Sequence, residues 1–263
     1  LANQLENSMG FNSSMIILST IAYGMQIYGD FSGYSSIAIG IALLLGFKIP
    51  INFNKPYFAT SPSDFWKRWH ISLSTWLKDY LYIPLGGNKK SSSRTYLNLF
   101  AVMFFGGLWH GASWNFVIWG ILHGSYLAIH KVITNKFPHI KDNMFFKNRW
   151  GTVLSILVTQ YFIFLAWIPF RVQDGSTMLH AIEKYILFDF QFDYLPIFIS
   201  KYSFEIILIV LFMSINFISY KIDLIDKISN LKMRYWTLFF AGVVLSILFF
   251  YGGNSEEFIY FQF

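Results

Sequence analysis

The chain has 263 residues, of which 55% are hydrophobic and 13% charged, whereas a soluble domain usually carries about 25% charged residues. Together with a mean hydropathy of +0.45, this composition excludes an ordinary soluble domain and predicts a polytopic membrane protein. The net charge of +6 is spread over loops between apolar segments, which argues against a nucleic-acid partner, and the absence of cysteine excludes disulfides, thiolate metal sites and a cysteine nucleophile in this chain.

Taken in chain order, the apolar segments predict an all-α, polytopic transmembrane helical bundle. Stretches 15–28 and 34–47 are separated by 29–33, where two glycines and Asp30 predict a turn or an unwound break. Further apolar runs cover 96–109, 113–129, 152–170, 204–220 and 235–251. We expect up to seven membrane-embedded segments in a single integral-membrane domain, 1–263. The run that ends before His110 is shorter than the roughly 20 residues of a full span, which favours a re-entrant helix.

A polar, basic section, 48–94, interrupts the apolar pattern. Ser61 is placed to cap a helix, and Pro62 suits its first position. Aromatic residues then recur at three- and four-residue spacing as far as Tyr80 and give one broad face. A basic helix with such a face is typical of a membrane interface, so the sequence predicts an amphipathic helix lying along the membrane over 61–82.

The distribution of charged residues over the loops predicts the membrane topology. Lys and Arg are in excess in sections 48–94, 131–149 and 221–234, whereas section 171–203 holds three bases against four acids. The positive-inside rule therefore places the first three sections in the cytoplasm. Section 171–203 and the C-terminal residues 252–263 then face outward.

His110 is the strongest candidate for chemistry. It follows an apolar run and precedes Gly111, and an ionisable ring at membrane depth is costly unless it has a function. The sequence around His110 leaves three interpretations of its role open: a general base, a structural hydrogen-bonding group or a metal ligand. The last is the weakest, because no tight His, Asp or Glu cluster surrounds it in the sequence.

Other polar residues are secondary candidates. His70 lies near the aromatic face of the predicted interfacial helix, with either a headgroup role or a site role. His123 lies thirteen residues after His110, which on one continuous helix would be a rotation of about 220° and so a different face. Asp79 is favoured as half of a surface ion pair with Lys78, and Asn115 could orient the imidazole or a substrate.

Three motifs carry a family resemblance: 29–35 (GDFSGYS), 62–88 (PSDFWKRWHISLSTWLKDYLYIPLGGN) and 106–116 (GGLWHGASWNF). In this order they resemble the membrane-bound O-acyltransferase (MBOAT) family. The turn at 82–88 and the closing segment 258–263 (FIYFQF) are similar to the bacterial alginate O-acetyltransferase branch. The branch that transfers D-alanine to teichoic acid shares the Trp-His pairs.

The resemblance implies an O-acyltransferase of the bacterial inner membrane, with His110 as the catalytic general base and His70 as the second candidate. Supporting or substrate-binding roles fall to Trp69, Asp79, Trp109, Asn115 and His123. It implies no metal and no bound cofactor, and an acyl donor such as acetyl-CoA or an acylated carrier as co-substrate.

It also implies a polysaccharide acceptor, a possible periplasmic acetyltransferase partner, and a chain that is roughly the C-terminal half of a longer protein. The alternatives are D-alanyl or other acyl transfer to a cell-wall polymer, and a transporter without bond chemistry. A transporter would favour paired interrupted helices in two repeats, and 150–251 offers no evident counterpart to the break near His110.

Overall fold

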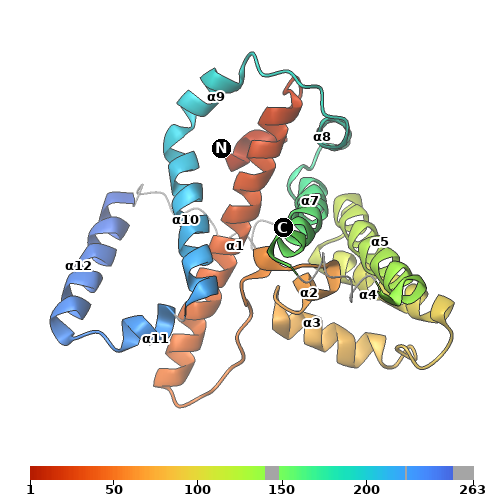
Figure 1. The fold of residues 1–263 in the computed structure, drawn as a ribbon, viewed down its shortest axis with the longest axis horizontal. Coiled ribbons are helices and arrows are strands. Elements are labelled where there is room, and N and C mark those ends of the chain that lie inside the picture. The colour runs from red at the N-terminus through yellow and green to blue at the C-terminus, as the bar shows by residue number, and fades with distance from the viewer. Residues whose placement is uncertain (140–147, 223, 251–263) are drawn as a thin grey trace. The chain divides into compact units, whose positions relative to one another are not determined.

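The computed structural model describes residues 1–139, 148–222 and 224–250 (Figure 1). Every regular element in these ranges is helical, which confirms the predicted all-α class. By length and composition, four of the described helices could cross a membrane: α1 (Ser13–Leu44), α5 (Trp114–Lys136), α7 (Arg149–Arg171) and α10 (Ser203–Lys221). Two compact units are distinguished, Leu1–Glu205 and Ile206–Phe263, and each is described by itself.

The predicted break at 29–33 is wrong, because α1 runs without interruption through 32 residues. At 1.5 Å per residue its length is roughly 48 Å, longer than the hydrocarbon core of a bilayer. A Cβ at Gly29 or Gly33 would meet nothing within 4 Å, so both glycines fit the helix and no close approach requires them. Asp30 is exposed on the helix surface and does not organise an unwound turn. Stretch 15–28 and the part of stretch 34–47 as far as Leu44 therefore belong to one helix, which could cross a membrane.

Helix α4 (Ser92–His110) and α5 form an antiparallel hairpin whose interface is built on glycines. A Cβ on Gly120 would lie 2.5 Å from the Met103 carbonyl oxygen, and one on Gly124 would lie 3.0 Å from the Phe100 Cα. Small residues at these positions allow the two backbones to touch, as is typical of helix pairs in membranes. Helix α4 ends at His110 as predicted, but it begins at Ser92 and has 19 residues, so it is longer than its apolar run.

The single interfacial helix predicted over 61–82 is divided in the structure. Its start is confirmed, since the Ser61 hydroxyl accepts from the Asp64 amide and Pro62 opens α2 (Pro62–Trp66). Helix α3 (Ile71–Leu77) and a π-helical turn, η3 (Lys78–Tyr82), follow after a break. The Asn52 carbonyl accepts from the Ile71 amide and its side chain from the Ser72 amide, so a distant segment replaces the helical bonds there.

The start of α1 is tied to the segment that follows α7. The Ser13 amide lies 3.3 Å from both carboxylate oxygens of Asp189, which also receives the Lys184 ammonium at 3.0 Å. Lys184 belongs to α8 (Gly175–Ile186), a short helix capped by Asp174. The short helices η1 (Ala2–Asn7) and α9 (Leu195–Lys201) complete this end of the unit, and η2 (Pro56–Phe58) packs on α7. The N-terminal end of α1 and section 187–191 therefore lie next to each other and share one side of the membrane.

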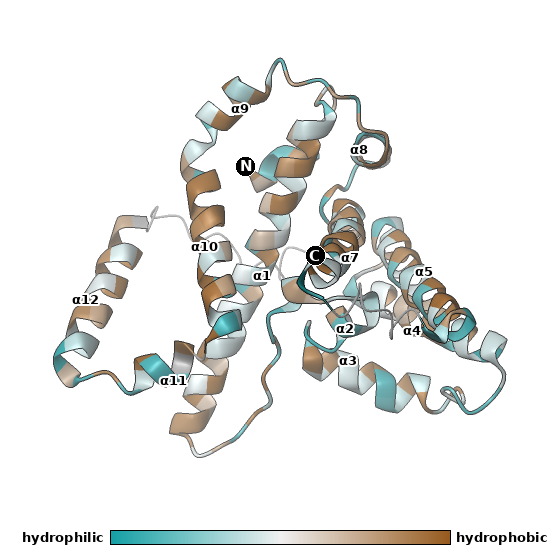
Figure 2. Ribbon diagram, in the orientation of Figure 1, coloured by the Kyte–Doolittle hydropathy of each residue, from teal (hydrophilic) through white to brown (hydrophobic). Residues whose placement is uncertain are grey.

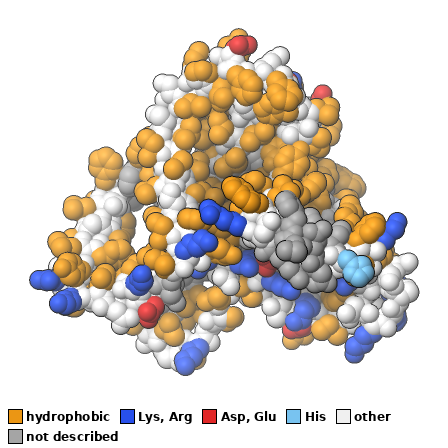
Figure 3. All heavy atoms as spheres, in the orientation of Figure 1, with side chains coloured by type: hydrophobic (Ala, Val, Ile, Leu, Met, Phe, Trp, Pro, Cys, Tyr) orange, Lys and Arg blue, Asp and Glu red, His pale blue; other side chains and the backbone are white. Residues whose placement is uncertain are grey.

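The second unit holds most of α10, α11 (Leu224–Ser229) and α12 (Met233–Phe250). Within α10 none of the described side chains is buried, and Figure 2 shows it as predominantly apolar. Large hydrophobic side chains are exposed on both units, and Figure 3 shows them over much of the visible face. This surface suits a lipid environment. The predicted outward segment 252–263, with the motif 258–263, lies outside the described residues.

Candidate functional site

His110 is the last residue of α4 and lies at the tip of the α4–α5 hairpin. The chain turns immediately after it, because Gly111 has a φ of +157° and a Cβ there would lie 2.8 Å from the Phe116 ring. The Ser113 hydroxyl then accepts from the Asn115 amide and caps α5. The sequence Gly111–Ser113 therefore fixes where the helix ends and holds the imidazole at the turn.

Aromatic rings from two helices pack around the His110 imidazole. Its centroid lies 5.1 Å from the Trp119 ring, 5.0 Å from Phe170 and 6.0 Å from Phe116. The rings also contact each other, with 5.1 Å between Phe116 and Phe170. His110 is half-buried against these rings.

His70 lies near His110, because both rings contact Trp109. The Trp109 ring is 5.0 Å from the His110 centroid and 6.3 Å from that of His70. His70 precedes α3 in the left-handed conformation, with φ of 43°, and its ring packs edge-on against Phe31 at 4.7 Å. Burial lowers the pKa of His70 to about 4, so this ring is neutral at physiological pH.

His123 is fully buried among aromatic rings. Its ring is 4.7 Å from Trp119, the same indole that contacts His110, and 5.0 Å from Trp66. The prediction that His110 and His123 lie on different faces assumed one continuous helix. The turn at Gly111–Ser113 instead brings both histidines to Trp119. Neither ring nitrogen has a hydrogen-bond partner among the residues that the structure describes. An unsatisfied buried polar group is costly, which makes His123 unusual for a purely structural residue.

The remaining predicted residues occupy different surroundings. The Asn115 side-chain amide donates to the Val172 carbonyl and ties the start of α5 to the end of α7. Trp69 is buried between Phe65 and Trp167, with centroid distances of 5.5 and 5.1 Å. These contacts give both side chains a structural role. Their predicted support of the site stays a prediction.

Asp79 lies in η3 and is exposed. Its carboxylate is 3.3 Å from the Lys78 ammonium, which is the surface ion pair favoured by the sequence. A supporting role for Asp79 in the reaction also stays a prediction.

Sequence reasoning missed the aromatic residues around the histidines, namely Phe170 and Trp119 beside His110 and Trp66 beside His123. Trp119 and Trp66 belong to recognised motifs or their flanks, yet helical spacing alone does not say which of many aromatic rings face His110. Phe170 comes from α7, some sixty positions further along the chain, and only tertiary packing places it there. The only local feature of the sequence that sets Phe170 apart is its neighbour Pro169, the proline inside α7.

The arrangement is suited to proton transfer. His110 shares the Trp109 ring with His70 and the Trp119 ring with His123, so the three histidines belong to one aromatic cluster. A neutral imidazole can accept a proton from a hydroxyl and return it later. Among the described residues, no three His, Cys, Asp or Glu side chains are grouped so that they could hold a metal ion.

Comparison with known proteins identifies a family and several relatives. A family model described as MBOAT, membrane-bound O-acyltransferase family, matches residues 5–166. The chain is 46% identical over 172 residues to the probable alginate O-acetylase AlgI of Pseudomonas aeruginosa, covering 65% of this chain and 31% of that protein. It is 45% identical over 166 residues to the peptidoglycan O-acetyltransferase of Helicobacter pylori, covering 63% and 30%.

A third relative is more distant. The teichoic acid D-alanyltransferase of Bacillus subtilis is 32% identical over 160 residues, covering 56% of this chain and 38% of that protein. The matched parts thus amount to about a third of the length of these curated relatives.

Proposed function

We propose that this chain, which belongs to the membrane-bound O-acyltransferase family, provides the catalytic histidine of an enzyme that O-acetylates a polysaccharide outside the cytoplasm. The observation that carries the proposal is the position of His110. It is the last residue of α4, precedes the turn at Gly111, and packs against the aromatic rings of Phe170 and Trp119. Such a ring is suited to act as a base.

The proposed reaction is acyl transfer from a thioester to a hydroxyl. One His110 nitrogen accepts the hydroxyl proton as the oxygen attacks the acyl carbonyl carbon. The carbon–sulfur bond then breaks, the ester forms, and the imidazolium returns its proton to the leaving thiolate. No proton or electron is left over, so the step needs no further reactant. Trp109, His70 and His123 are proposed to hold the imidazole in place.

The donor and acceptor approach from opposite sides in this proposal. The donor, acetyl-CoA or an acylated carrier, comes from the cytoplasmic side of the bacterial inner membrane. The acceptor is an alginate-like exopolysaccharide or another extracytoplasmic polymer, since two relatives are named for alginate and peptidoglycan O-acetylation. A periplasmic acetyltransferase partner would receive the acetyl group first if the transfer is a relay.

A second candidate is D-alanyl transfer to a cell-wall polymer. The 32% identity to the teichoic acid D-alanyltransferase of Bacillus subtilis favours keeping it. The identities of 45% and 46% to O-acetylating relatives rank it below acetyl transfer.

The decisive experiment measures ester-linked acetate and D-alanine on surface polysaccharides of cells that express the full-length protein. Wild type is compared with His110→Ala at equal membrane abundance. We expect acetate to fall by about 10²- to 10⁴-fold, the usual contribution of a general base. The fraction that loses acetate identifies the acceptor.

An exposed histidine provides the control, because His139→Ala should leave acetate unchanged. If D-alanine is lost and acetate is not, the second candidate replaces the first. If neither ester changes in His110→Ala, His110 is not the catalytic base and a transporter without bond chemistry becomes the better interpretation.

A further inference from the structure

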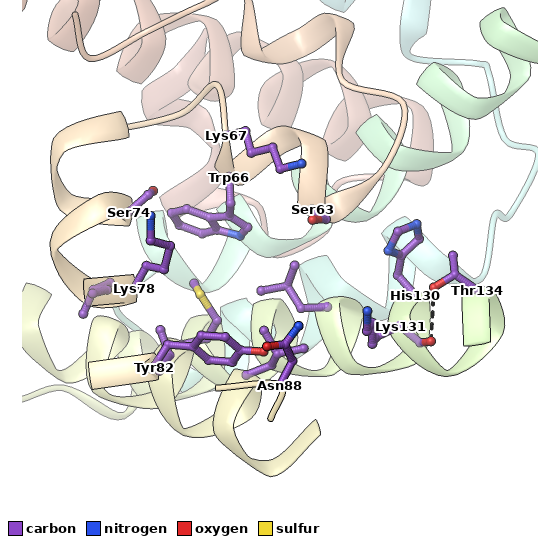
Figure 4. A pocket seen from close by; sticks show the side chains of 15 residues that line it. Ser63, Trp66, Lys67, Ser74, Lys78, Tyr82, Asn88, His130, Lys131 and Thr134 are labelled. Atoms are coloured by element: carbon purple, nitrogen blue, oxygen red, sulfur yellow. Dashed lines mark hydrogen bonds between the residues drawn. The ribbon is translucent and has the colours of Figure 1, made fainter. Parts of the chain in front are cut away.

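Residues 169–172, at the end of α7, lie beside the tip that carries His110. The Phe170 ring is 5.0 Å from the imidazole centroid, and the Val172 carbonyl accepts from the Asn115 side chain at the start of α5. This segment is separate from the pocket of about 360 Å³ shown in Figure 4, because none of the described residues that line the pocket belongs to α7. The end of α7 therefore belongs to the surroundings of His110.

Pro169 weakens the helix at this point. Proline has no N–H, so the helical hydrogen bond from residue 169 to the Leu165 carbonyl cannot form. The Val172 amide still donates to the Ile168 carbonyl at 2.9 Å and closes the last turn. Because the helix supplies one bond fewer here, contacts from outside it have a larger part in fixing the position of Phe170.

Arg171 makes such contacts with η1 and α1. Its Nη2 group donates to the Asn3 side-chain oxygen at 3.1 Å and to the Glu6 carboxylate at 3.4 Å. Its guanidinium also lies 5.7 Å from the Tyr23 ring of α1. Leu5 of η1 and Tyr23 are both fully buried, so these two elements are themselves firmly packed. The Arg171 side chain therefore joins the end of α7 to fixed neighbours.

The surroundings of Arg171 favour a role in geometry over a role in stability. The side chain is 18% exposed, and its Nε–H is buried with no acceptor among the described residues. A buried donor without a partner costs free energy, which an apolar side chain in the same space would not. The planar guanidinium, however, fixes the direction of its hydrogen bonds in a way that a lysine ammonium does not.

We propose that Arg171 is a positioning residue for His110, which acts by holding the Phe170 ring against the imidazole. The inference rests on the proposed function, in which His110 accepts the hydroxyl proton, and adds to it a residue outside the segment 5–166 that the family model matches. A displacement of about 1 Å at a reacting group can lower a rate by about 10²-fold. A small shift of Phe170 that lets the imidazole move is therefore sufficient to affect acyl transfer.

The first measurement is ester-linked acetate on surface polysaccharides of cells that express the full-length protein at equal membrane abundance. We expect Arg171→Gln to lower acetate by about 10- to 10²-fold, and Arg171→Lys, which keeps the charge but loses the planar group, to lower it nearly as much. Glu6→Gln should have a smaller effect, because Asn3 still accepts from Arg171. Arg149→Gln, at an exposed arginine at the other end of α7, is the matched control and should leave acetate unchanged.

The second measurement reports the position of His110 without requiring turnover. Diethyl pyrocarbonate modifies accessible histidine rings, so its rate at His110, followed by mass spectrometry on the purified full-length protein, reports how closely Phe170 covers the ring. We expect several-fold faster modification of His110 in both Arg171 variants and an unchanged rate at the exposed His139. A loss of the fold would instead also expose the fully buried His123, and Arg171→Lys decides the question if Arg171→Gln does so.

A double-variant cycle tests whether Arg171 acts through Phe170. If it does, Arg171→Gln should lower acetate less in a Phe170→Leu background than in wild type, whereas independent effects would multiply. Multiplied effects, wild-type acetate in the Arg171 variants, or a fall in acetate without faster modification of His110 would each overturn the inference while His110 remains essential. If His110→Ala still transfers acetate, the proposed function is wrong, and the modification rates alone decide whether Arg171 holds the ring.

Discussion

His70 has a backbone conformation that few non-glycine residues adopt, and its ring is held between Phe31 and Trp109. Burial lowers its pKa from 6.5 to about 4, while a backbone hydrogen bond opposes part of that change. The unfolded chain therefore takes up a proton near pH 6.5 that the folded protein refuses until about pH 4. Stability from this residue is complete above pH 6.5 and decreases as the pH falls toward 4.

We therefore predict that His70→Asn weakens the acid sensitivity of folding. The thermal midpoint of the full-length protein in detergent should fall less between pH 7 and pH 5 in the variant than in wild type. Asn is chosen because it tolerates the left-handed conformation. His139→Asn, at an exposed position, should behave as wild type; equal pH dependence in all three proteins would contradict the role of His70.

His123 allows a similar separation of stability from activity. Both of its ring nitrogens are buried without a partner among the described residues, and its neighbours are the rings of Trp119 and Trp66. We predict that His123→Phe unfolds at the same or a higher temperature, because removing an unsatisfied polar group saves about 1–3 kcal/mol. If His123 positions His110 through Trp119, acetyl transfer should nevertheless fall by about 10²-fold. A variant that unfolds early would show that the nitrogens have a structural partner.

Sequence reasoning selects His110 as a candidate because its polar ring follows an apolar run, and His70 because it lies near the aromatic face of a predicted interfacial helix. It did not identify Phe170, whose surroundings in α7 are as apolar as those of its neighbours. Local sequence indicates which residues can do chemistry. It does not indicate which of many aromatic side chains, contributed from a distant helix, will enclose them.

At the scale of the helices, the glycines show which helix ends and breaks can be predicted from the sequence and which cannot. The sequence predicts a break at Gly29 and Gly33, yet both lie within α1, where apolar neighbours on both sides sustain the helix. Gly111 does end a helix, because its φ and the nearby Phe116 ring exclude a side chain. The division of the 61–82 helix could not be predicted, since it depends on bonds from Asn52.

The same contrast gives a prediction for helix packing. Gly120→Ala would place a methyl group 2.5 Å from the Met103 carbonyl and force α4 and α5 apart, so we expect a loss of folded protein in the membrane. Gly29→Ala would meet nothing and should leave the protein as stable or more stable by about 0.5–1 kcal/mol. For both variants, the measurement is the fraction of protein that stays monodisperse in detergent after mild heating. Equal behaviour of the two variants would mean that the hairpin interface is less close than described.

At the scale of the whole molecule, topology decides whether the proposed donor and acceptor can reach His110 from opposite sides. The structure joins the start of α1 to Asp189 after α7, so these ends share one side. Section 48–94 follows the other end of α1, and the pocket in Figure 4 includes residues from it and from the end of α5. Together with the positive-inside rule, this favours an outward section 171–203 and an inward pocket.

The chain contains no cysteine, so single cysteines introduced into it report their own exposure. We predict that Asp193→Cys in intact cells reacts with a membrane-impermeant maleimide, whereas Lys136→Cys reacts only after the membrane is opened. Both positions are exposed in the folded protein, so burial does not explain a difference between them. If the pattern were reversed, section 48–94 would face away from the cytoplasm. The proposed donor and acceptor would then have to exchange sides, so this one labelling experiment also tests the direction of acyl transfer.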